Sequence, residues 1–310
     1  NDRRRQNIGN QCHHQKRMKT GTFETKASGV SYPLHYKIWG ADNPPSKTIA
    51  CVHGLTRNSQ EFKFVGEYLA SLGYRVAALD IAGRGQSSYY ANPDDYNFEQ
   101  YLKDISLFLK EIGCDQPASC DWLGVSMGGL LGMCIAGGAE ASPIRRLILV
   151  DVGPEVPQFD MAFLAKFIRL TPEYNSPAEN VPFLKMTLGT PYSCGEMTED
   201  QWLYMSTVNL RKNDSEKYIR NFDPNIAHTF DTSMNAVDFW PFWERIYQPT
   251  LALRGELSTL FPVRVADDMK TRKPNDKLTL ETIAGAGHVP SLFRDDQIKI
   301  IADWLAVAAG

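Results

Sequence analysis

A serine set among small residues is the part of the sequence best suited to chemistry. Residues 124–129 read GVSMGG, after an apolar β-prone run and before a run with helical spacing. A G-x-S-x-G pattern between a strand and a helix is typical of a nucleophile elbow, because its glycines permit a cramped turn that projects the serine hydroxyl. The alternative is a turn that only packs a helix on a sheet. The context favours Ser126 as a nucleophile.

A nucleophilic serine needs a base, and histidine titrates near neutral pH. Of the six histidines, His288 lies on a predicted loop between the last predicted strand and the last predicted helix. The other five fall in the N-terminal segment, an early strand, a His-Gly loop and a helical region. We therefore predict that His288 is the base; a capping or packing role is the alternative.

Two backbone N–H groups are candidates for stabilising an oxyanion. One belongs to Met127, directly after the serine, and the other to Leu55, in the loop VHGLTR (residues 52–57). Two such donors that converge on one oxygen form an oxyanion hole. Arg57 in the same loop either binds a substrate carboxylate or pairs with an acid in the loop LDIAGRGQSS (residues 79–88), and we favour the pairing.

The rest of the pattern predicts the elements that position these residues. After a hairpin, short apolar runs alternate with segments of helical spacing up to residue 153, and the alternation resumes at residue 249. Such alternation predicts parallel strands joined by right-handed crossovers, with helices on both faces. We therefore expect an α/β fold with a mostly parallel sheet, in which ligands bind at the carboxyl edge of the strands.

The alternation breaks between Pro154 and Phe242, where helical spacing continues without a convincing strand and aromatic residues are frequent. We predict a core formed by residues 21–153 and 245–310, interrupted by a helical cap at residues 154–244. We expect residues 1–20, which are basic and polar, to be a flexible extension or an addition to the natural protein.

Composition excludes several classes of protein. The net charge is -3, and 43% of the residues are hydrophobic, so nothing indicates a nucleic-acid partner. No apolar run approaches the roughly 20 residues of a membrane-spanning helix. The six cysteines are scattered, and Cys12, His13 and His14 lack a partner cluster with ligand spacing. We expect a cytoplasmic protein with reduced thiols and with neither a metal nor an organic cofactor; the oligomeric state is not predicted.

These blocks together resemble the α/β-hydrolase family. The resemblance covers nearly everything after residue 21 and is carried by VHGLTRNSQEF, LDIAGRGQSS, LGVSMGGLLGM, LVDVGPEV, LALRGELS and GAGHVPSL. It implies a Ser-His-acid triad, a helical cap over the pocket and the hydrolysis of esters or related acyl compounds. It says little about the substrate, because one fold hosts many chemistries.

The acid is the point at which this sequence departs from the family pattern. In similar proteins the acid most often follows the strand that reads LALRGE here, but the loop places hold Ser258 and Thr259. Two carboxylates remain. Glu256 lies one residue after the glycine, and Asp151 ends the strand expected next to the nucleophile strand. We favour Asp151, because its strand end would lie beside that of the serine; Glu256 is the alternative.

We therefore predict a serine hydrolase that cleaves a carboxylic ester or lactone through an acyl-enzyme on Ser126. The substrate would be a small apolar or aromatic acyl compound, contacted by Arg57, Trp202 and Val289. One alternative is a carbon–carbon bond hydrolase that acts on a diketone-like substrate with the same triad. Another is a non-catalytic ligand receptor, which the missing loop acid would support. A haloalkane dehalogenase or epoxide hydrolase is disfavoured, because its attacking residue would be an aspartate.

Overall fold

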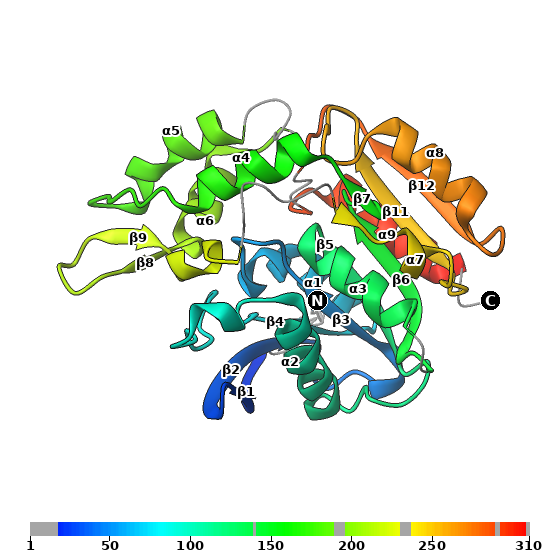
Figure 1. Cartoon of the computed structure of the whole chain (residues 1–310). Helices are drawn as coiled ribbons and strands as arrows, with labels where there is room; N and C mark the ends of the chain where they lie inside the picture. The colour runs from blue at the N-terminus through cyan, green and yellow to red at the C-terminus, as the bar shows by residue number, and fades with distance from the viewer. Residues whose placement is uncertain (1–17, 139–140, 189–195, 230–236, 289–291, 308–310) are drawn as a thin grey trace, which may run out of the picture.

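An eight-stranded sheet organises the part of the chain described by the computed structural model, which covers residues 18–138, 141–188, 196–229, 237–288 and 292–307 (Figure 1). Its order is β1-β2-β4-β3-β5-β6-β11-β12. β1 and β2 are antiparallel to each other, and β2 is antiparallel to β4; the remaining pairs are parallel. The prediction of a mostly parallel α/β sheet is confirmed. The strands are β1 (Lys19–Ala27), β2 (Val30–Trp39), β3 (Thr48–Val52), β4 (Arg75–Leu79), β5 (Cys120–Val125), β6 (Ile144–Val150), β11 (Thr250–Gly255) and β12 (Leu278–Ile283).

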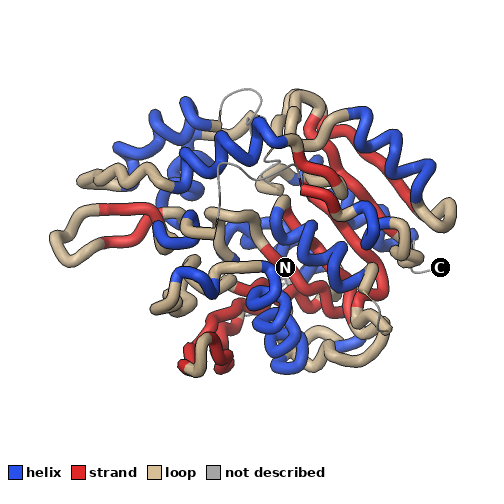
Figure 2. The backbone as a smooth tube through the Cα atoms, viewed as in Figure 1, coloured by secondary structure: helices blue, strands red, loops and turns tan. Residues whose placement is uncertain are grey.

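Helices cover both faces of this sheet (Figure 2). Alternate strand residues point to opposite faces, so Ile49 and Cys51 of β3 join one hydrophobic cluster while Ala50 and Val52 join the other. The first cluster also contains side chains of α1 (Lys63–Ser71) and α9 (Asp295–Val307); the second contains those of α2 (Phe98–Glu111), α3 (Met127–Ala136) and α8 (Val263–Arg272). Burial on both faces explains why the central strands are apolar throughout rather than alternating.

The segment between β6 and β11 is called the cap segment (residues 154–244), and its first three helices lie together to one side of the sheet in Figure 1. It contains α4 (Gln158–Ile168), α5 (Pro177–Thr187), α6 (Glu199–Val208) and α7 (Trp240–Trp243). The structure corrects the expectation that no strand occurs here, because β7 (Glu155–Val156) pairs with β10 (Val237–Asp238), and β8 (Leu210–Lys212) pairs with β9 (Tyr218–Arg220). Strands of two or three residues are too short to show an alternating pattern.

Loops at the carboxyl ends of β3 and β4 contact the cap segment. Asn58 donates from Nδ2 to the Val208 carbonyl at 2.9 Å, and the N–H of Asp223 donates to the Gly83 carbonyl at 2.7 Å. These bonds fix the cap segment over the edge where the predicted site lies. Short 3-10 helices complete the described elements: η1 (Pro45–Lys47), η2 (Ser59–Phe62), η3 (Pro93–Asp95) and η4 (Pro224–Ala227).

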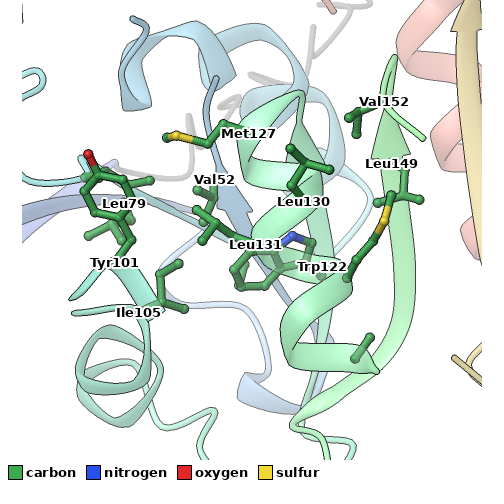
Figure 3. Packing of buried hydrophobic residues seen from close by; sticks show 14 of the residues in the cluster. Val52, Leu79, Tyr101, Ile105, Trp122, Met127, Leu130, Leu131, Leu149 and Val152 are labelled. Carbon is green, nitrogen blue, oxygen red and sulfur yellow. The ribbon is translucent and has the colours of Figure 1, made fainter. Parts of the chain in front are cut away.

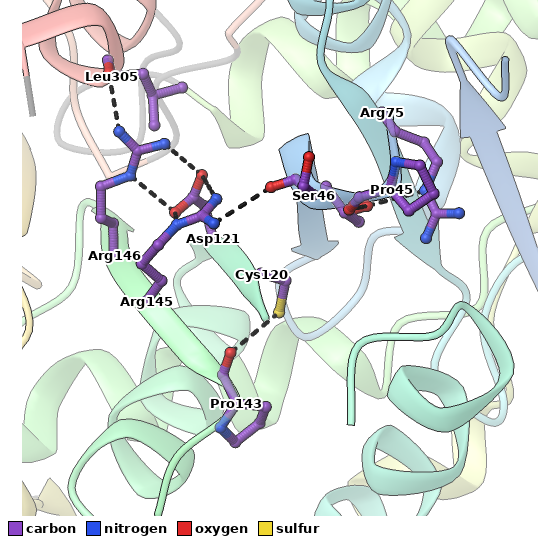
Figure 4. Close-up of polar contacts among 10 residues, drawn as sticks. Pro45, Ser46, Arg75, Cys120, Asp121, Pro143, Arg145, Arg146 and Leu305 are labelled. Atoms are coloured by element: carbon purple, nitrogen blue, oxygen red, sulfur yellow. Dashed lines mark hydrogen bonds and ion pairs between the residues drawn. The ribbon is translucent and has the colours of Figure 1, made fainter. Parts of the chain in front are cut away.

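A buried ion cluster closes the opposite, amino edge of the sheet (Figure 4). Asp121, at the start of β5, is fully buried and accepts two hydrogen bonds from each of Arg145 and Arg146, at 2.6 to 3.2 Å. Arg146 also donates to the Leu305 carbonyl of α9 at 2.8 Å. The cluster therefore joins β5, β6 and the last helix.

Four of the six cysteines lie in the described residues, and all four are free thiols. Cys51, Cys114 and Cys120 are buried free thiols and Cys134 is a half-buried free thiol, whereas Cys12 and Cys194 lie outside the described residues. In the described ranges, none of the helices has the length and apolar character needed to cross a bilayer.

Candidate active site

Ser126 occupies a sharp turn between β5 and α3. Its φ is +51°, a left-handed conformation that costs energy for any residue with a Cβ and persists only where the surroundings enforce it. Two glycines allow this turn. A Cβ on Gly124 would lie 2.3 Å from the Gly128 carbonyl oxygen, and a Cβ on Gly128 would lie 2.0 Å from that of Val52. Only glycine fits either position, so this backbone projects the Ser126 side chain from the edge of the sheet.

The layer beneath this turn is densely packed (Figure 3). Trp122 of β5 and Leu131 of α3 are fully buried against Val52 of β3, and the indole N–H of Trp122 donates to the Gly128 carbonyl at 3.0 Å. Because the tryptophan holds the same peptide that crowds Gly124, the strand, the turn and the helix are locked together. A rigid support of this kind fixes the direction of the Ser126 side chain.

Ser126, His288 and Asp151 form a continuous hydrogen-bonded chain. Ser126 Oγ lies 3.1 Å from His288 Nε2, and His288 Nδ1 lies 2.9 Å from Asp151 Oδ2. Since a carboxylate accepts only, His288 carries its proton on Nδ1, and Nε2 faces the serine hydroxyl as an acceptor. The structure thus brings together the three residues that the sequence predicted as nucleophile, base and acid.

Asp151 is fully buried at the end of β6, and its φ of +51° turns the chain out of the sheet. Its Oδ1 accepts the Gly255 N–H at 2.7 Å, and its Oδ2 accepts the Ser258 hydroxyl at 2.6 Å as well as His288 Nδ1. Burial raises the pKa of the Asp151 carboxyl, while the bonds from His288, Ser258 and Gly255 oppose that rise. These three directed donors therefore offset part of the cost of burying the carboxylate.

The alternative acid, Glu256, does not reach the imidazole in this arrangement. Its side chain is exposed, and its Oε2 accepts the Gly285 N–H at 2.8 Å. Ser258, in the same loop, points instead at Asp151, and Thr259 donates to Asp160 at 2.9 Å. The loop after β11 thus supplies a hydrogen-bond donor to the buried acid.

The loop after β3 lies against the serine. A Cβ on Gly54 would come within 3.6 Å of Ser126 Cβ. His53 Nδ1 donates to the Gly54 carbonyl at 2.7 Å, and this peptide is the one that carries the Leu55 N–H; His53 Nε2 accepts the Ile81 N–H at 3.0 Å. Burial lowers the pKa of His53 to about 4, so the ring stays neutral in this tautomer.

A buried guanidinium fixes the other side of the same loop. Arg84 has no exposed surface, and its Nε donates to the Leu55 carbonyl at 2.8 Å. Its Nη1 donates to the Tyr101 hydroxyl at 2.9 Å. The peptides on both sides of Leu55 are therefore anchored. Met127 is the first residue of α3, so its N–H has no acceptor within the helix and lies at the positive end of the helix dipole.

A cavity of about 550 Å³ opens beside Ser126 and extends between the core and the cap segment. Its walls are aliphatic and aromatic, with few polar groups. They are formed by Leu55, Tyr96, Asn97, Phe98, Tyr101, Ser126, Met127, Leu130, Val152, Val156, Met161, Leu164, Ile226, Thr229, Val237, Asp238, Phe239 and Leu260. Figure 3 shows four of these residues, Met127, Leu130, Tyr101 and Val152, next to the packed core. Apolar concave sites of this size are typical of small-molecule binding.

The structure does not place the predicted substrate contacts on this wall. Arg57 is not among its residues; its guanidinium pairs with Glu61 of η2, four residues further along the chain, at 3.2 Å. The favoured pairing with the loop at residues 79–88 is therefore wrong as well: the acid in that loop, Asp80, bonds to His35 and to the N–H groups of Ser59 and Gln86.

Trp202 is also absent from the cavity wall, and Val289 lies outside the described residues. The Trp202 ring is buried in a separate cluster with Leu184, Leu188, Met205 and Phe293. The sequence did not single out Phe98 and Tyr101 as cavity residues. Their signal was the apolar face of α2, which is typical of a core helix and does not reveal that its first turn faces an opening.

Comparisons with known proteins identify the fold and the family. Residues 47–295 match the family model of the α/β hydrolase fold. The chain is 29% identical to a 3-hydroxybutyrate-oligomer hydrolase of Cupriavidus necator over 86% of this chain and 90% of that protein. It is 24% identical to a pimeloyl-[acyl-carrier protein] methyl ester esterase of Aliivibrio fischeri over 86% and 95%. A crystal structure of an α/β hydrolase from Novosphingobium aromaticivorans superposes with a TM-score of 0.79 at 26% identity, covering 93% of this chain and 98% of that one.

Proposed function

Since the chain belongs to the α/β-hydrolase family, we propose that it is a serine hydrolase that cleaves a carboxylic ester or lactone through an acyl-enzyme on Ser126. The observation that carries this proposal is the chain of hydrogen bonds from Ser126 through His288 to Asp151, at the mouth of an apolar cavity. This arrangement has the order and the polarity of a nucleophile, a base and an orienting acid.

The proposed reaction has two halves. His288 Nε2 takes the proton of Ser126 as Oγ attacks the acyl carbonyl, and the imidazolium then gives that proton to the leaving alkoxide when the ester bond breaks. In the second half, His288 takes a proton from water, the hydroxide attacks the acyl-enzyme, and the proton returns to Ser126 as the carboxylic acid departs. A lactone follows the same steps, with the leaving alkoxide on the released hydroxy acid.

Two anchored N–H groups would stabilise the tetrahedral intermediate. The Leu55 peptide is held by His53, and the Met127 N–H stands at the start of α3. Donors that are fixed before the reaction cost no reorganisation when the oxyanion forms, and one such donor is typically worth about 3 kcal/mol in the transition state. Asp151 would stabilise the imidazolium that appears in each half-reaction.

The cavity supports an uncharged acyl group. In the wall as described, no Lys, Arg or His side chain is present to pair with a carboxylate, and the one carboxylate there is that of Asp238. The sequence between Thr229 and Val237 reads FDTSMNA and also lacks a basic residue. Burial of an unpaired charge is strongly unfavourable. The names of the two relatives, an oligomer hydrolase and a methyl ester esterase, are consistent with acyl compounds as substrates.

The first experiment is covalent labelling with a fluorophosphonate probe. We expect labelling at Ser126 in the folded wild type and none in Ser126→Ala. If the folded wild type is not labelled, the protein is not a serine hydrolase, and a ligand receptor becomes the better description. A panel of ester, lactone, amide and diketone substrates, with Ser126→Ala as the blank, then identifies the bond cleaved.

A matched pair within that panel tests the acyl group. The p-nitrophenyl ester of hexanoic acid and the mono-p-nitrophenyl ester of adipic acid have acyl chains of the same length, but the second ends in a carboxylate. We expect kcat/KM to favour the neutral chain by at least about tenfold, because the described part of the cavity wall offers no cation to pair with the carboxylate. Equal rates would show that the acyl end is not enclosed by this cavity.

A further inference from the structure

Ser258 makes a contact that the triad alone does not require. Its side chain is buried in the loop after β11, and its hydroxyl donates to Asp151 Oδ2 at 2.6 Å. The same oxygen accepts His288 Nδ1 at 2.9 Å. Ser258 and His288 therefore meet on one carboxylate oxygen, from the loops that follow β11 and β12.

The direction of the Ser258 proton is fixed by a second bond. A hydroxyl has one hydrogen and two lone pairs. The Phe261 N–H donates to Ser258 Oγ at 3.2 Å and occupies the acceptor side. The hydrogen is then left for the carboxylate, so Ser258 acts toward Asp151 as a donor.

The loop that carries Ser258 is braced by one backbone hydrogen bond and one from a side chain. The Ser258 N–H donates to the Gly255 carbonyl at 3.1 Å, and Arg254 Nε donates to the Phe261 carbonyl at 2.8 Å. The hydroxyl is thus held by its own strand end and not only by the group it contacts. A donor fixed in this way can impose a geometry on Asp151 rather than merely follow it.

Asp151 has a clear need for such a donor. It is fully buried, and no Lys or Arg in the described part of the structure forms an ion pair with it. Gly255 binds the other oxygen, Oδ1. Apart from the Ser258 hydroxyl, the His288 N–H is the donor on Oδ2, and His288 must move protons during the proposed reaction. A donor that does not take part in proton transfer would keep Oδ2 in place throughout.

We propose that Ser258 is a positioning residue of the active site, whose hydroxyl holds Asp151 Oδ2 where it meets His288 Nδ1. This inference rests on the proposed function for its kinetic consequence, but the contact itself can be measured without turnover. The loop after β11 therefore serves the triad by orienting an acid that the end of β6 supplies.

The kinetic test compares Ser258→Ala with Ser258→Thr and with the neighbouring Thr259→Ala, whose side chain bonds Asp160 rather than Asp151. For Ser258→Ala we expect kcat to fall about tenfold with KM little changed, since a hydrogen bond to a charged group is lost. Loss of this donor raises the pKa of Asp151, so the acid limb of the pH–rate profile should move to higher pH. Ser258→Thr should recover most of the rate, and Thr259→Ala should match the wild type. Unchanged kcat and an unchanged acid limb in Ser258→Ala would overturn the proposal.

An exchange variant tests the geometry directly. Combining Asp151→Ser with Ser258→Asp exchanges the two partners of this hydrogen bond. The carboxylate then comes from position 258, and we expect it to reach His288. We expect the double variant to be at least about tenfold more active than Asp151→Ser alone, because the carboxylate again faces the imidazole. A folded double variant that is no more active than Asp151→Ser would contradict the shared position of the two side chains.

Proton NMR separates this inference from the proposed function. The His288 Nδ1 proton, bonded to a buried carboxylate, should give a strongly downfield resonance that disappears in Asp151→Asn. In Ser258→Ala we expect it to shift and to exchange faster with water, and in Thr259→Ala to stay unchanged. If the wild type shows no Ser126-dependent turnover but the resonance responds as expected, the proposed function fails and the positioning role stands. If the resonance is the same in Ser258→Ala, the positioning role fails whatever the turnover.

Discussion

Two buried aspartates lie at opposite edges of the same sheet and have opposite kinds of partner. Asp121 starts β5 and is held by the guanidinium groups of Arg145 and Arg146. Asp151 follows β6 and is held by a peptide N–H, a hydroxyl and the imidazole of His288. Neither carboxylate has exposed surface. Burial alone therefore does not distinguish a structural aspartate from one that serves chemistry.

The difference lies in what the partners can do with a proton. Arginine stays charged at all accessible pH values, so the Asp121 cluster is a fixed ion pair that ties β5 to β6 and α9. Histidine gains and loses a proton near neutral pH. In the proposed reaction Asp151 would stabilise a charge on His288 that appears and disappears. No change of charge is needed in the cluster at the amino edge, which consists of Asp121, Arg145, Arg146 and the Leu305 carbonyl (Figure 4).

The largest expected effect separates the two aspartates by activity. Asp151→Asn should lower kcat about 10⁴-fold, because an amide neither holds the reactive tautomer of His288 nor stabilises the imidazolium. The control is Asp121→Asn, whose position is about 16 Å along β5 from Ser126. Measured per mole of folded protein, this control should keep near-normal kcat. Near-normal turnover in Asp151→Asn would remove Asp151 from the proposed triad.

The free energy of unfolding should show the reverse order, with Asp121→Asn as the destabilised variant. Asp121→Asn should lower the free energy of unfolding by about 3–5 kcal/mol, because the buried guanidinium of Arg146 loses its counter-charge. Urea denaturation monitored by circular dichroism measures this change. Arg145→Met is a milder comparison, since that side chain is partly exposed and should cost less. A loss below about 1 kcal/mol in Asp121→Asn would mean that the cluster does not anchor the amino edge.

Asp151→Asn should instead raise the thermal stability at neutral pH. Burial raises the folded-state pKa of Asp151 above its unfolded value. Such a carboxyl contributes stability that is fully present below the unfolded pKa, about 4, and is lost as the pH rises through the folded pKa. The wild type should therefore lose stability relative to Asp151→Asn as the pH increases over this window. Calorimetric melting temperatures of both proteins from about pH 4 to pH 8 test the sign. A neutral-pH melting temperature that falls in Asp151→Asn would show that its hydrogen bonds outweigh its desolvation.

Much of the fold and the centre of the site follow from local sequence. The turn at GVSMGG can be predicted from the sequence because steric limits allow only glycine at positions 124 and 128. Such limits act over a few residues. The position of Asp151, the proposed acid, beside Ser126 could be predicted in one topological step, since neighbouring parallel strands end at the same edge. The central strands of the sheet can be predicted because burial on both faces requires continuous apolar runs.

The parts that sequence reasoning did not reach depend on long-range packing. The hydroxyl of Ser258 meets a residue 107 positions away, and no periodicity encodes that contact. Trp202 was predicted to contact the substrate. Its ring instead packs with Leu184, Leu188, Met205 and Phe293 in a separate hydrophobic cluster. Arg57 pairs with Glu61, only four residues away, but it lies in the loop before η2, so the helical i,i+4 rule does not apply and the contact depends on the loop conformation.

The smallest expected effect concerns the alternative acid. Glu256 and Asp151 both contact the loops around His288, but Glu256 is exposed and binds the Gly285 N–H, three residues before the histidine. Glu256→Gln keeps an oxygen that can accept this bond, so kcat/KM should stay within about twofold of the wild type. The assay is the same ester hydrolysis used for Asp151→Asn, with both variants purified in parallel. If Glu256→Gln loses as much activity as Asp151→Asn, then burial and direct contact are not what select the acid, and the contrast between exposed and buried carboxylates at this edge would not hold.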